Sequence, residues 1–136
     1  MANNTQQVPR VLVNRVSEQA VFPCGGIISS AKTITLQGWN RTLVPTDLRF
    51  IIPAGVCLHI AIIPDLSQQS LSVNQGYMCG PCSDALVWVD MYNRSGSPFK
   101  LKAGDHIAWL DVLHNKITPK LIDVTPLFNN QPTSYN

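Results

Sequence analysis

Short runs of β-branched and aromatic residues, separated by Pro and Gly, recur along this chain. Such runs are typical of strands, and the breaks between them come too often for long helices. Turn signals lie at 23–26, 53–55, 94–98 and 102–105, and a helical turn is expected only at 46–50 and 67–70. The pattern predicts an all-β single domain, a β-sandwich or a jelly-roll-like barrel. The expected strands are 11–16, 33–36, 56–63, 86–92, 99–101, 107–113 and 120–124.

Two of these strands are apolar on both faces. Residues 86–89 read Leu-Val-Trp-Val and residues 107–110 read Ile-Ala-Trp-Leu. Strands of this kind are covered on both sides. Either a neighbouring subunit or a loop over a two-layer core is expected to supply the second cover. Trp88 and Trp109 are then core or interface anchors, and the alternative is that one of them is exposed for binding.

The composition indicates a single globular domain and gives no sign of nucleic-acid binding or of a membrane span. The chain has 136 residues, 45% of them hydrophobic and only 13% charged, with a net charge of +2. One domain of sparse charge is expected, and low charge favours association into an oligomer. No basic stripe indicates nucleic-acid binding, and no apolar run approaches the roughly 20 residues that span a membrane. The polar residues 1–10 form no signal peptide, so a reducing compartment is expected.

Several motifs in the second half of the chain resemble the trimeric dUTPase family. Residues 92–95 (Tyr-Asn-Arg-Ser) precede 98–108, which ends in Gly-Asp-His-Ile-Ala. Upstream, 43–48 and 52–55 are similar to the family's Val-x-Thr-Gly and Ile-Pro-x-Gly segments. Residues 60–67 stand where the family has its phosphate loop. The resemblance implies a dUTPase-like jelly-roll β-barrel that assembles as a homotrimer.

The resemblance divides the chain into three parts. Residues 11–127 form the dUTPase-like β domain. Residues 1–10 are expected to be a polar N-terminal arm, and residues 128–136 a polar C-terminal tail.

The family hydrolyses dUTP with a water-orienting carboxylate, Mg²⁺ on the triphosphate, an Arg-Ser loop and a glycine-rich arm. At the corresponding positions this chain has other residues. They are Asp65 and Leu66 for the Arg-Ser pair, Cys79 for the water-orienting Asp, Cys82 for the Tyr under the sugar, Ser83 for the adjacent Arg, and Trp109 for the Gln of the Gly-Asp turn segment. Residues 24–28 are the nearest stretch to the early Ala-Gly-Tyr-Asp segment. No glycine follows Gly104.

Of these replacements, Asp65 is the strongest argument against nucleotide binding. An Asp in place of an Arg turns attraction to a phosphate into repulsion, on the order of 4 kcal/mol at close range. We therefore expect a catalytically inactive, non-enzymatic relative that acts by protein–protein interaction. Some adenoviral early proteins share this fold and lack its site, so a virus is the expected source.

Such a protein is expected to bind itself and a host or virion protein, without a cofactor, metal, nucleic acid or membrane. The expected location is the host-cell cytoplasm or nucleus, or the virion. The alternative is a nucleotide-hydrolysing, dUTPase-like enzyme with a rebuilt active site at the old cleft between subunits.

Cys79-Gly-Pro-Cys82 has the spacing of a redox motif or of half a zinc site. A redox pair needs a helix start and zinc needs two more ligands, and neither is evident from the sequence. The third interpretation is a structural loop, with thiols or a disulfide. His59 is expected to be a core or interface residue and His106 an exposed one. Asp105 is expected to cap amides in its turn.

Overall fold

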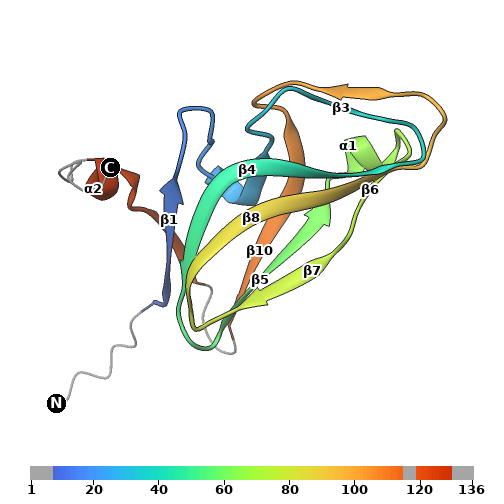
Figure 1. The fold of residues 1–136 in the computed structure, drawn as a ribbon. Coiled ribbons are helices and arrows are strands. Elements are labelled where there is room, and N and C mark those ends of the chain that lie inside the picture. The colour runs from blue at the N-terminus through green and yellow to red at the C-terminus, as the bar shows by residue number, and fades with distance from the viewer. Residues whose placement is uncertain (1–7, 115–118, 130–136) are drawn as a thin grey trace, which may run out of the picture.

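The computed structural model describes residues 8–114 and 119–129 (Figure 1). Almost all of its regular structure is β-strand. The elements are β1 (Arg10–Arg15), η1 (Cys24–Gly26), β2 (Ile27–Ser29), β3 (Ile34–Leu36), β4 (Arg41–Ile52), β5 (Val56–Ile62), α1 (Pro64–Ser67), β6 (Leu71–Val73), β7 (Gly76–Cys79), β8 (Cys82–Asn93), β9 (Phe99–Leu101), β10 (His106–His114), β11 (Lys120–Asp123) and α2 (Thr125–Asn129).

The strands form two larger sheets and one short pair. Sheet A has the order β11-β1-β4-β8-β6, and sheet B has the order β2-β10-β5-β7. Strands β3 and β9 pair separately. Alternate residues of both larger sheets are buried in one core, among them Val44 and Leu48 of sheet A and Leu58 and Ile107 of sheet B. The predicted all-β, single-domain class is therefore confirmed.

Strand β4 corrects the expected helical turn at 46–50. The strand is twelve residues long and pairs with β1 on one side and β8 on the other. Pro45 of β4 pairs with Trp88 of β8, and Arg49 pairs with Leu86. The β4 segment is therefore two residues longer than the β8 segment opposite it, which is a β-bulge. Pro in a central strand is tolerated at such a bulge. The sequence alone does not predict this strand, because Pro45 and the polar residues after it are typical of a break between strands.

Hydrogen bonds from Thr46 and Asp47 hold this bulge. The buried Thr46 hydroxyl donates to the Val87 carbonyl at 2.8 Å and accepts from the Leu48 amide at 3.2 Å. Asp47 has a φ of 54°, and its carboxylate accepts a hydrogen bond from Ser17 Oγ at 2.5 Å. Side chains thus replace the strand pairing that the extra residues interrupt.

The other differences concern short elements. The helical turn expected at 67–70 lies instead at Pro64–Ser67, where Pro64 occupies the first turn. Strands β2, β6 and β7 were not predicted. Strand β9 has the predicted bounds.

The Asn93 carboxamide closes the loop between β8 and β9. The residue is 1% exposed, and its side-chain nitrogen donates to the carbonyls of Leu36 and Ser97, at 3.0 and 2.8 Å. Its oxygen accepts from the Ser95 amide at 3.0 Å. The Asn of the family-like segment therefore has a structural role here.

The outer faces of the two sheets expose large apolar side chains. Trp88 is 51% exposed and Trp109 48% exposed, while Val87, Val89, Ile107 and Leu110 are buried. The expectation that the tryptophans belong to the core is wrong, because the alternation of each strand turns them outward. Within the described residues no loop covers them, so the interface alternative stays a prediction.

Helix α2, the last element described, lies beside β1, as Figure 1 shows. Strand β1 begins at Arg10 and α2 ends at Asn129. Most of the predicted arms, residues 1–7 and 130–136, lie outside the described residues. Neither helix among those described is long and apolar enough to cross a membrane.

Candidate functional site

The positions marked by the family resemblance lie at two ends of sheet B. Asp65 and Leu66 belong to α1, which follows β5, whereas Cys79, Cys82 and Ser83 belong to the β7–β8 hairpin at the start of β5 (Figure 1). The length of β5 separates the two groups by roughly 15–20 Å. One copy of the chain therefore does not bring them into a single site.

A cavity of about 410 Å³ lies between α1 and the turn that precedes β10. Its wall includes Asp65, Gln69, Asp105 and His106, with apolar side chains that include Leu66. Asp65 is exposed, while Leu66 is 7% exposed and packs in the core. None of the described residues that line this cavity is Lys or Arg. A bare triphosphate would thus meet carboxylates and no positive side chain.

The turn beside this cavity has the predicted structure. The Lys102 amide donates to Asp105 Oδ2 at 2.8 Å, and the Asp105 amide donates to the Lys102 carbonyl at 2.9 Å. Gly104 has a φ of 93°, which glycine adopts most readily. Asp105 is therefore a turn cap as predicted, and His106 is exposed as predicted.

Cys79 forms a disulfide with Cys57, its direct neighbour across β5 and β7. Cys82 is a free cysteine that packs against the core, and Cys24 is free and exposed. The Cys79–Cys82 redox pair is thus not formed. Among the described residues no group of three or more His, Cys, Asp or Glu side chains is placed to hold a metal ion. The structural interpretation of the loop fits, with a partner that sequence spacing did not identify.

A row of three side chains crosses the outer face of sheet B. Asp111 of β10, His59 of β5 and Tyr77 of β7 are aligned by the strand register. The His59 and Tyr77 rings stack with centroids 4.6 Å apart, and His59 Nδ1 lies 3.8 Å from Asp111 Oδ2. His59 therefore lies outside the core, on the outer face of the sheet, with 17% of its side chain exposed, and its expected place in an interface stays a prediction. Sequence reasoning missed the row because its members are far apart in the chain.

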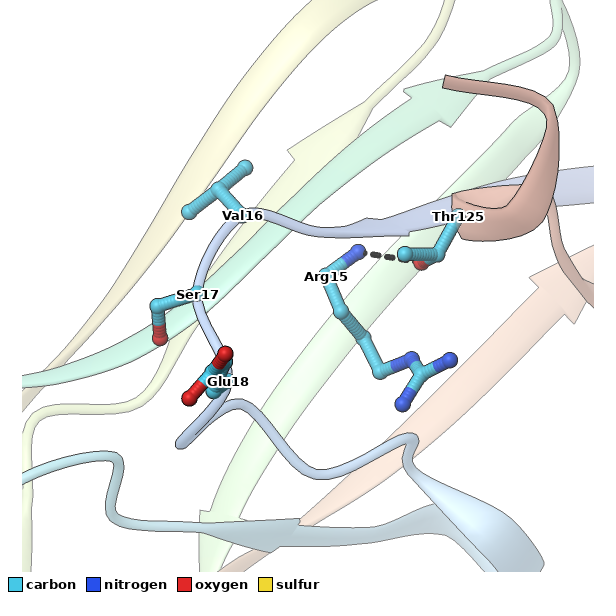
Figure 2. Close-up of a pocket in the computed structure, with 5 residues that line it drawn as sticks. All are labelled: Arg15, Val16, Ser17, Glu18 and Thr125. Atoms are coloured by element: carbon cyan, nitrogen blue, oxygen red, sulfur yellow. Dashed lines mark hydrogen bonds between the residues drawn. The ribbon is translucent and has the colours of Figure 1, made fainter. Parts of the chain in front are cut away.

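Another cavity, of about 550 Å³, lies where β1 ends beside α2 (Figure 2). The Arg15 side chain extends into it and the Thr125 hydroxyl accepts from the Arg15 amide at 2.6 Å. Arg15 Nε is 3.1 Å from Asp123 Oδ2, and Glu18 also lines the cavity. The Arg15 charge is thus already offset by the Asp123 carboxylate, which leaves little attraction for an anionic ligand.

Comparison with known proteins identifies similar chains. No family model matches. The deoxyuridine 5'-triphosphate nucleotidohydrolase of Arabidopsis thaliana is 31% identical over 127 residues, covering 88% of this chain and 75% of the relative. The enzyme of that name from Solanum lycopersicum is 32% identical over 128 residues, with coverage of 88% and 75%. That of Fowl adenovirus A serotype 1 is 32% identical over 127 residues, with coverage of 88% and 70%.

Solved structures of phage dUTPases have the same fold. A mutant dUTPase of the S. aureus phage phi11 superposes with a TM-score of 0.68 at 17% identity, covering 76% of this chain and 90% of that one. A mutant dUTPase of Staphylococcus bacteriophage 80alpha, with dUpNHpp, gives a TM-score of 0.69 at 17% identity, covering 82% and 91%. These matches bear out the dUTPase-like β-barrel.

The comparisons overturn the expectation of a non-enzymatic protein. The relatives from plants and from an adenovirus all carry the name of one hydrolase, and they match most of this chain. Substitution at the family's catalytic positions does not by itself exclude hydrolysis. The alternative interpretation, an enzyme with a rebuilt site, fits these relatives. The chain belongs to the deoxyuridine 5'-triphosphate nucleotidohydrolase (dUTPase) family.

Proposed function

We propose that this protein hydrolyses dUTP or a closely related nucleoside triphosphate at a rebuilt site. The observation that carries the proposal is the 31% identity to a dUTPase across 88% of the chain. All four relatives carry the name of the same nucleotide hydrolase, which supports nucleotide hydrolysis as the reaction. The resemblance puts Asp65, Cys79 and Cys82 at the family's catalytic positions, so we propose that the groups that act on the substrate differ from those of the family.

The proposed site lies between subunits of a homotrimer. Asp65 and the β7–β8 hairpin are at opposite ends of β5, so a second copy is needed to bring a hairpin against the α1 cavity. The exposed Trp88 and Trp109 supply apolar surface on both sheets for such an assembly. Burying this surface would favour association at about 25 cal/mol per Å².

The charge of the α1 cavity favours a nucleotide that carries Mg²⁺. Asp65 and Asp105 line the cavity, and two carboxylates repel a free triphosphate. Mg²⁺ binds oxygen ligands and commonly reaches proteins on substrate phosphates, where it offsets their charge. We therefore take the metal to be part of the substrate and assign no protein ligands to it.

Two measurements on the full chain test the proposal. Pyrophosphate release is followed with dUTP, dCTP, dTTP and UTP over a range of Mg²⁺ concentrations. Native mass spectrometry is recorded with and without Mg²⁺ and a non-hydrolysable dUTP analogue. Hydrolysis of one nucleotide in preference to the others, with the analogue bound to a trimer, is expected. A trimer that neither binds the analogue nor hydrolyses any of the four would overturn the proposal, as would a monomer that is active.

A viral source, a host or virion partner, and a location in the host cell or virion stay predictions. The fowl adenovirus relative is consistent with a virus, and the plant relatives are equally similar. Co-purification of the intact chain with particles or host proteins would test these points.

A further inference from the structure

Half of the basic residues of this chain stand in two short segments, 30–41 and 93–105, which supply β3, β9 and the loops around them. They are Lys32, Arg41, Arg94, Lys100 and Lys102. The two segments contain a single acidic residue, Asp105. Because the whole chain has a net charge of only +2, the rest of it carries more acidic than basic residues. Such charge asymmetry favours an anionic partner at the basic end.

Strand pairing brings these two segments together. Strands β3 and β9 are antiparallel, with Thr35 opposite Lys100, and run side by side at the top of Figure 1. The Ala103 amide donates to Thr33 Oγ1 at 3.1 Å, so the end of β9 also lies against the segment that carries Lys32. No two basic residues are adjacent in the chain, and the sequence therefore predicts no basic stripe.

One face of the β3–β9 pair is polar and open to solvent. Leu101 is 1% exposed and belongs to the core, and Phe99 lines the α1 cavity. Successive side chains of a strand point to opposite faces, so Lys100 points away from both. Thr35, its partner across the pair, is exposed like Lys100. This outer face is the basic ribbon, formed by the exposed residues Thr33, Thr35, Lys100 and Lys102.

The positive charges of the basic ribbon and its surroundings are largely unpaired. Arg41 forms an ion pair with Asp90 at 3.1 Å. The Asp105 carboxylate accepts a hydrogen bond from the Lys102 amide and is held in its turn. The other basic side chains are exposed and form no ion pair with another described residue: Lys32, Arg94, Lys100 and Lys102. They are available to an anionic partner.

An exposed tryptophan lies beside Arg94. The Trp39 amide donates to the carbonyls of Asn93 and Ser95, at 2.9 and 3.1 Å, and these two residues flank Arg94 in the chain. Trp39 is 63% exposed, so a large aromatic surface faces solvent. An aromatic ring next to positive side chains is the combination that binds single-stranded nucleic acid, by stacking on bases and attraction to phosphates.

The backbone holds Trp39 in this exposed position. Its φ is 59°, which a bulky residue rarely adopts. Conformations of this kind cluster at functional sites. A Cβ on Gly38 would come within 2.7 Å of the Gly96 carbonyl oxygen, so the loop that carries Trp39 packs directly on the loop that carries Arg94. The fold thus presents the indole and the guanidinium together.

We propose that the basic ribbon, with Trp39 and Arg94 at its end, binds single-stranded nucleic acid. The lysines contact phosphates and a base stacks on the indole. Exposed threonine hydroxyls donate hydrogen bonds to phosphate oxygens. The inference goes beyond the proposed hydrolysis and does not depend on it, and it replaces the expectation that the chain has no nucleic-acid partner.

The dimensions of this surface fit a short single strand. Thr33 and Trp39 are six residues apart, at most roughly 20 Å along a strand. This length suits about four nucleotides, the low end of the roughly 4–16 that one β domain binds. A membrane surface fits less well, because one indole accompanies the lysines where an interfacial segment has a continuous apolar face.

The test measures binding of the full chain to a fluorescein-labelled oligothymidylate of about 12 nucleotides, which is long enough for one such site. Fluorescence anisotropy is recorded from roughly 50 to 200 mM salt. The logarithm of the association constant is expected to fall with the logarithm of the salt concentration with a slope of about −2 to −3, the value for three or four phosphate contacts on a single strand. Tryptophan fluorescence is expected to be quenched on binding.

Charge variants locate the phosphate contacts. Lys100→Gln/Lys102→Gln is expected to weaken binding at about 50 mM salt roughly tenfold and to reduce the magnitude of the slope by about 1.4. The matched control is Arg10→Gln/Lys120→Gln, which removes the same charge from two exposed residues that pair across β1 and β11, away from β3 (Figure 1). It should change binding less than about twofold.

Variants of Trp39 test the stacking contact. Trp39→Leu is expected to weaken binding by roughly tenfold and to abolish most of the fluorescence quenching, while Trp39→Phe keeps a ring and should retain most of the affinity. Thermal unfolding shows that each variant is folded.

Equal weakening by the two double charge variants would overturn the site, because binding would then follow net charge alone. Quenching that persists in Trp39→Leu would do the same, as would a DNA duplex that binds as tightly as the single strand. Polyglutamate that displaces the oligonucleotide as well as unlabelled oligothymidylate does would point to an acidic protein instead. Tighter binding to phosphatidylserine vesicles would point to a membrane, and either result would refute the proposal.

Discussion

Cys57 and Cys79 lie directly opposite each other on β5 and β7 and are joined by a disulfide. Cys79 is the residue that the family resemblance places where the water-orienting carboxylate belongs. A disulfide sulfur neither orients nor deprotonates water as a carboxylate does, so hydrolysis by this chain needs a carboxylate from elsewhere. The bond instead ties the edge strand β7 to β5.

Removal of this disulfide should lower the stability of the domain. In the double variant Cys57→Ser/Cys79→Ser the free energy of unfolding is expected to fall by about 2–4 kcal/mol, because the unfolded chain is no longer closed into a loop. Urea unfolding with and without dithiothreitol measures the effect. Cys24→Ser, at a free and exposed cysteine, is the control and should match the unmodified chain. Identical unfolding of the oxidised and reduced protein would refute the bond's role.

Asn93→Ala should be among the most destabilising substitutions of a polar residue. The buried carboxamide makes two hydrogen bonds to carbonyls and accepts one from the Ser95 amide, and alanine leaves these groups unsatisfied. A loss of about 3 kcal/mol is expected. Chemical denaturation gives the value. Asn40→Ala, at an exposed residue with one hydrogen bond to Gly38, should cost less than about 1 kcal/mol.

Thr46→Val tests whether the bulge in β4 depends on a single hydroxyl. Valine keeps the shape of threonine but neither donates to the Val87 carbonyl nor accepts from the Leu48 amide. The expected cost is about 1–3 kcal/mol, since both groups are buried. Thermal unfolding of Thr46→Val and of Thr42→Val, at a half-buried position of the same strand, provides the comparison. Equal melting temperatures would mean that the bulge is held by other contacts.

Asp65→Asn should impair hydrolysis of the Mg²⁺–nucleotide. Two carboxylates line the α1 cavity, those of Asp65 and Asp105. Asp105 Oδ2 already accepts a hydrogen bond from the Lys102 amide, so Asp65 is better placed to accept a proton from a water molecule. Loss of a group that accepts a proton from water reduces kcat by about 10²–10⁴. Steady-state kinetics at saturating Mg²⁺ measures it.

The control for Asp65 is Glu18→Gln, which removes an exposed carboxylate at the other cavity. It should leave kcat unchanged. An unchanged kcat in Asp65→Asn would move the catalytic group to another part of the assembly.

Much of the fold was predictable where local pattern and turn chemistry agree. The strand at 99–101 and the Asp105 turn were predicted because each depends on neighbours within a few residues. Strand β4 was not, because Pro45 and Asp47 break the local pattern and only the bulge against β8 accommodates them. The contacts of the candidate site were even harder to predict from the sequence. Cys57 with Cys79, and Asp111 with His59 and Tyr77, meet through strand register and not through sequence spacing.

The sequence by itself determined the fold class, the turns and the family, since alternation, Pro and Gly positions and the Asn-to-Gly-Asp spacing are local properties of the chain. The resemblance also led to the prediction that the family's catalytic residues are replaced, which stays a prediction. Only the tertiary structure decided which cysteine Cys79 joins, that Trp88 and Trp109 face outward, and which carboxylates share a cavity. The physical reason is that sheet register aligns residues across strands, and a shift of one residue would turn each side chain to the other face.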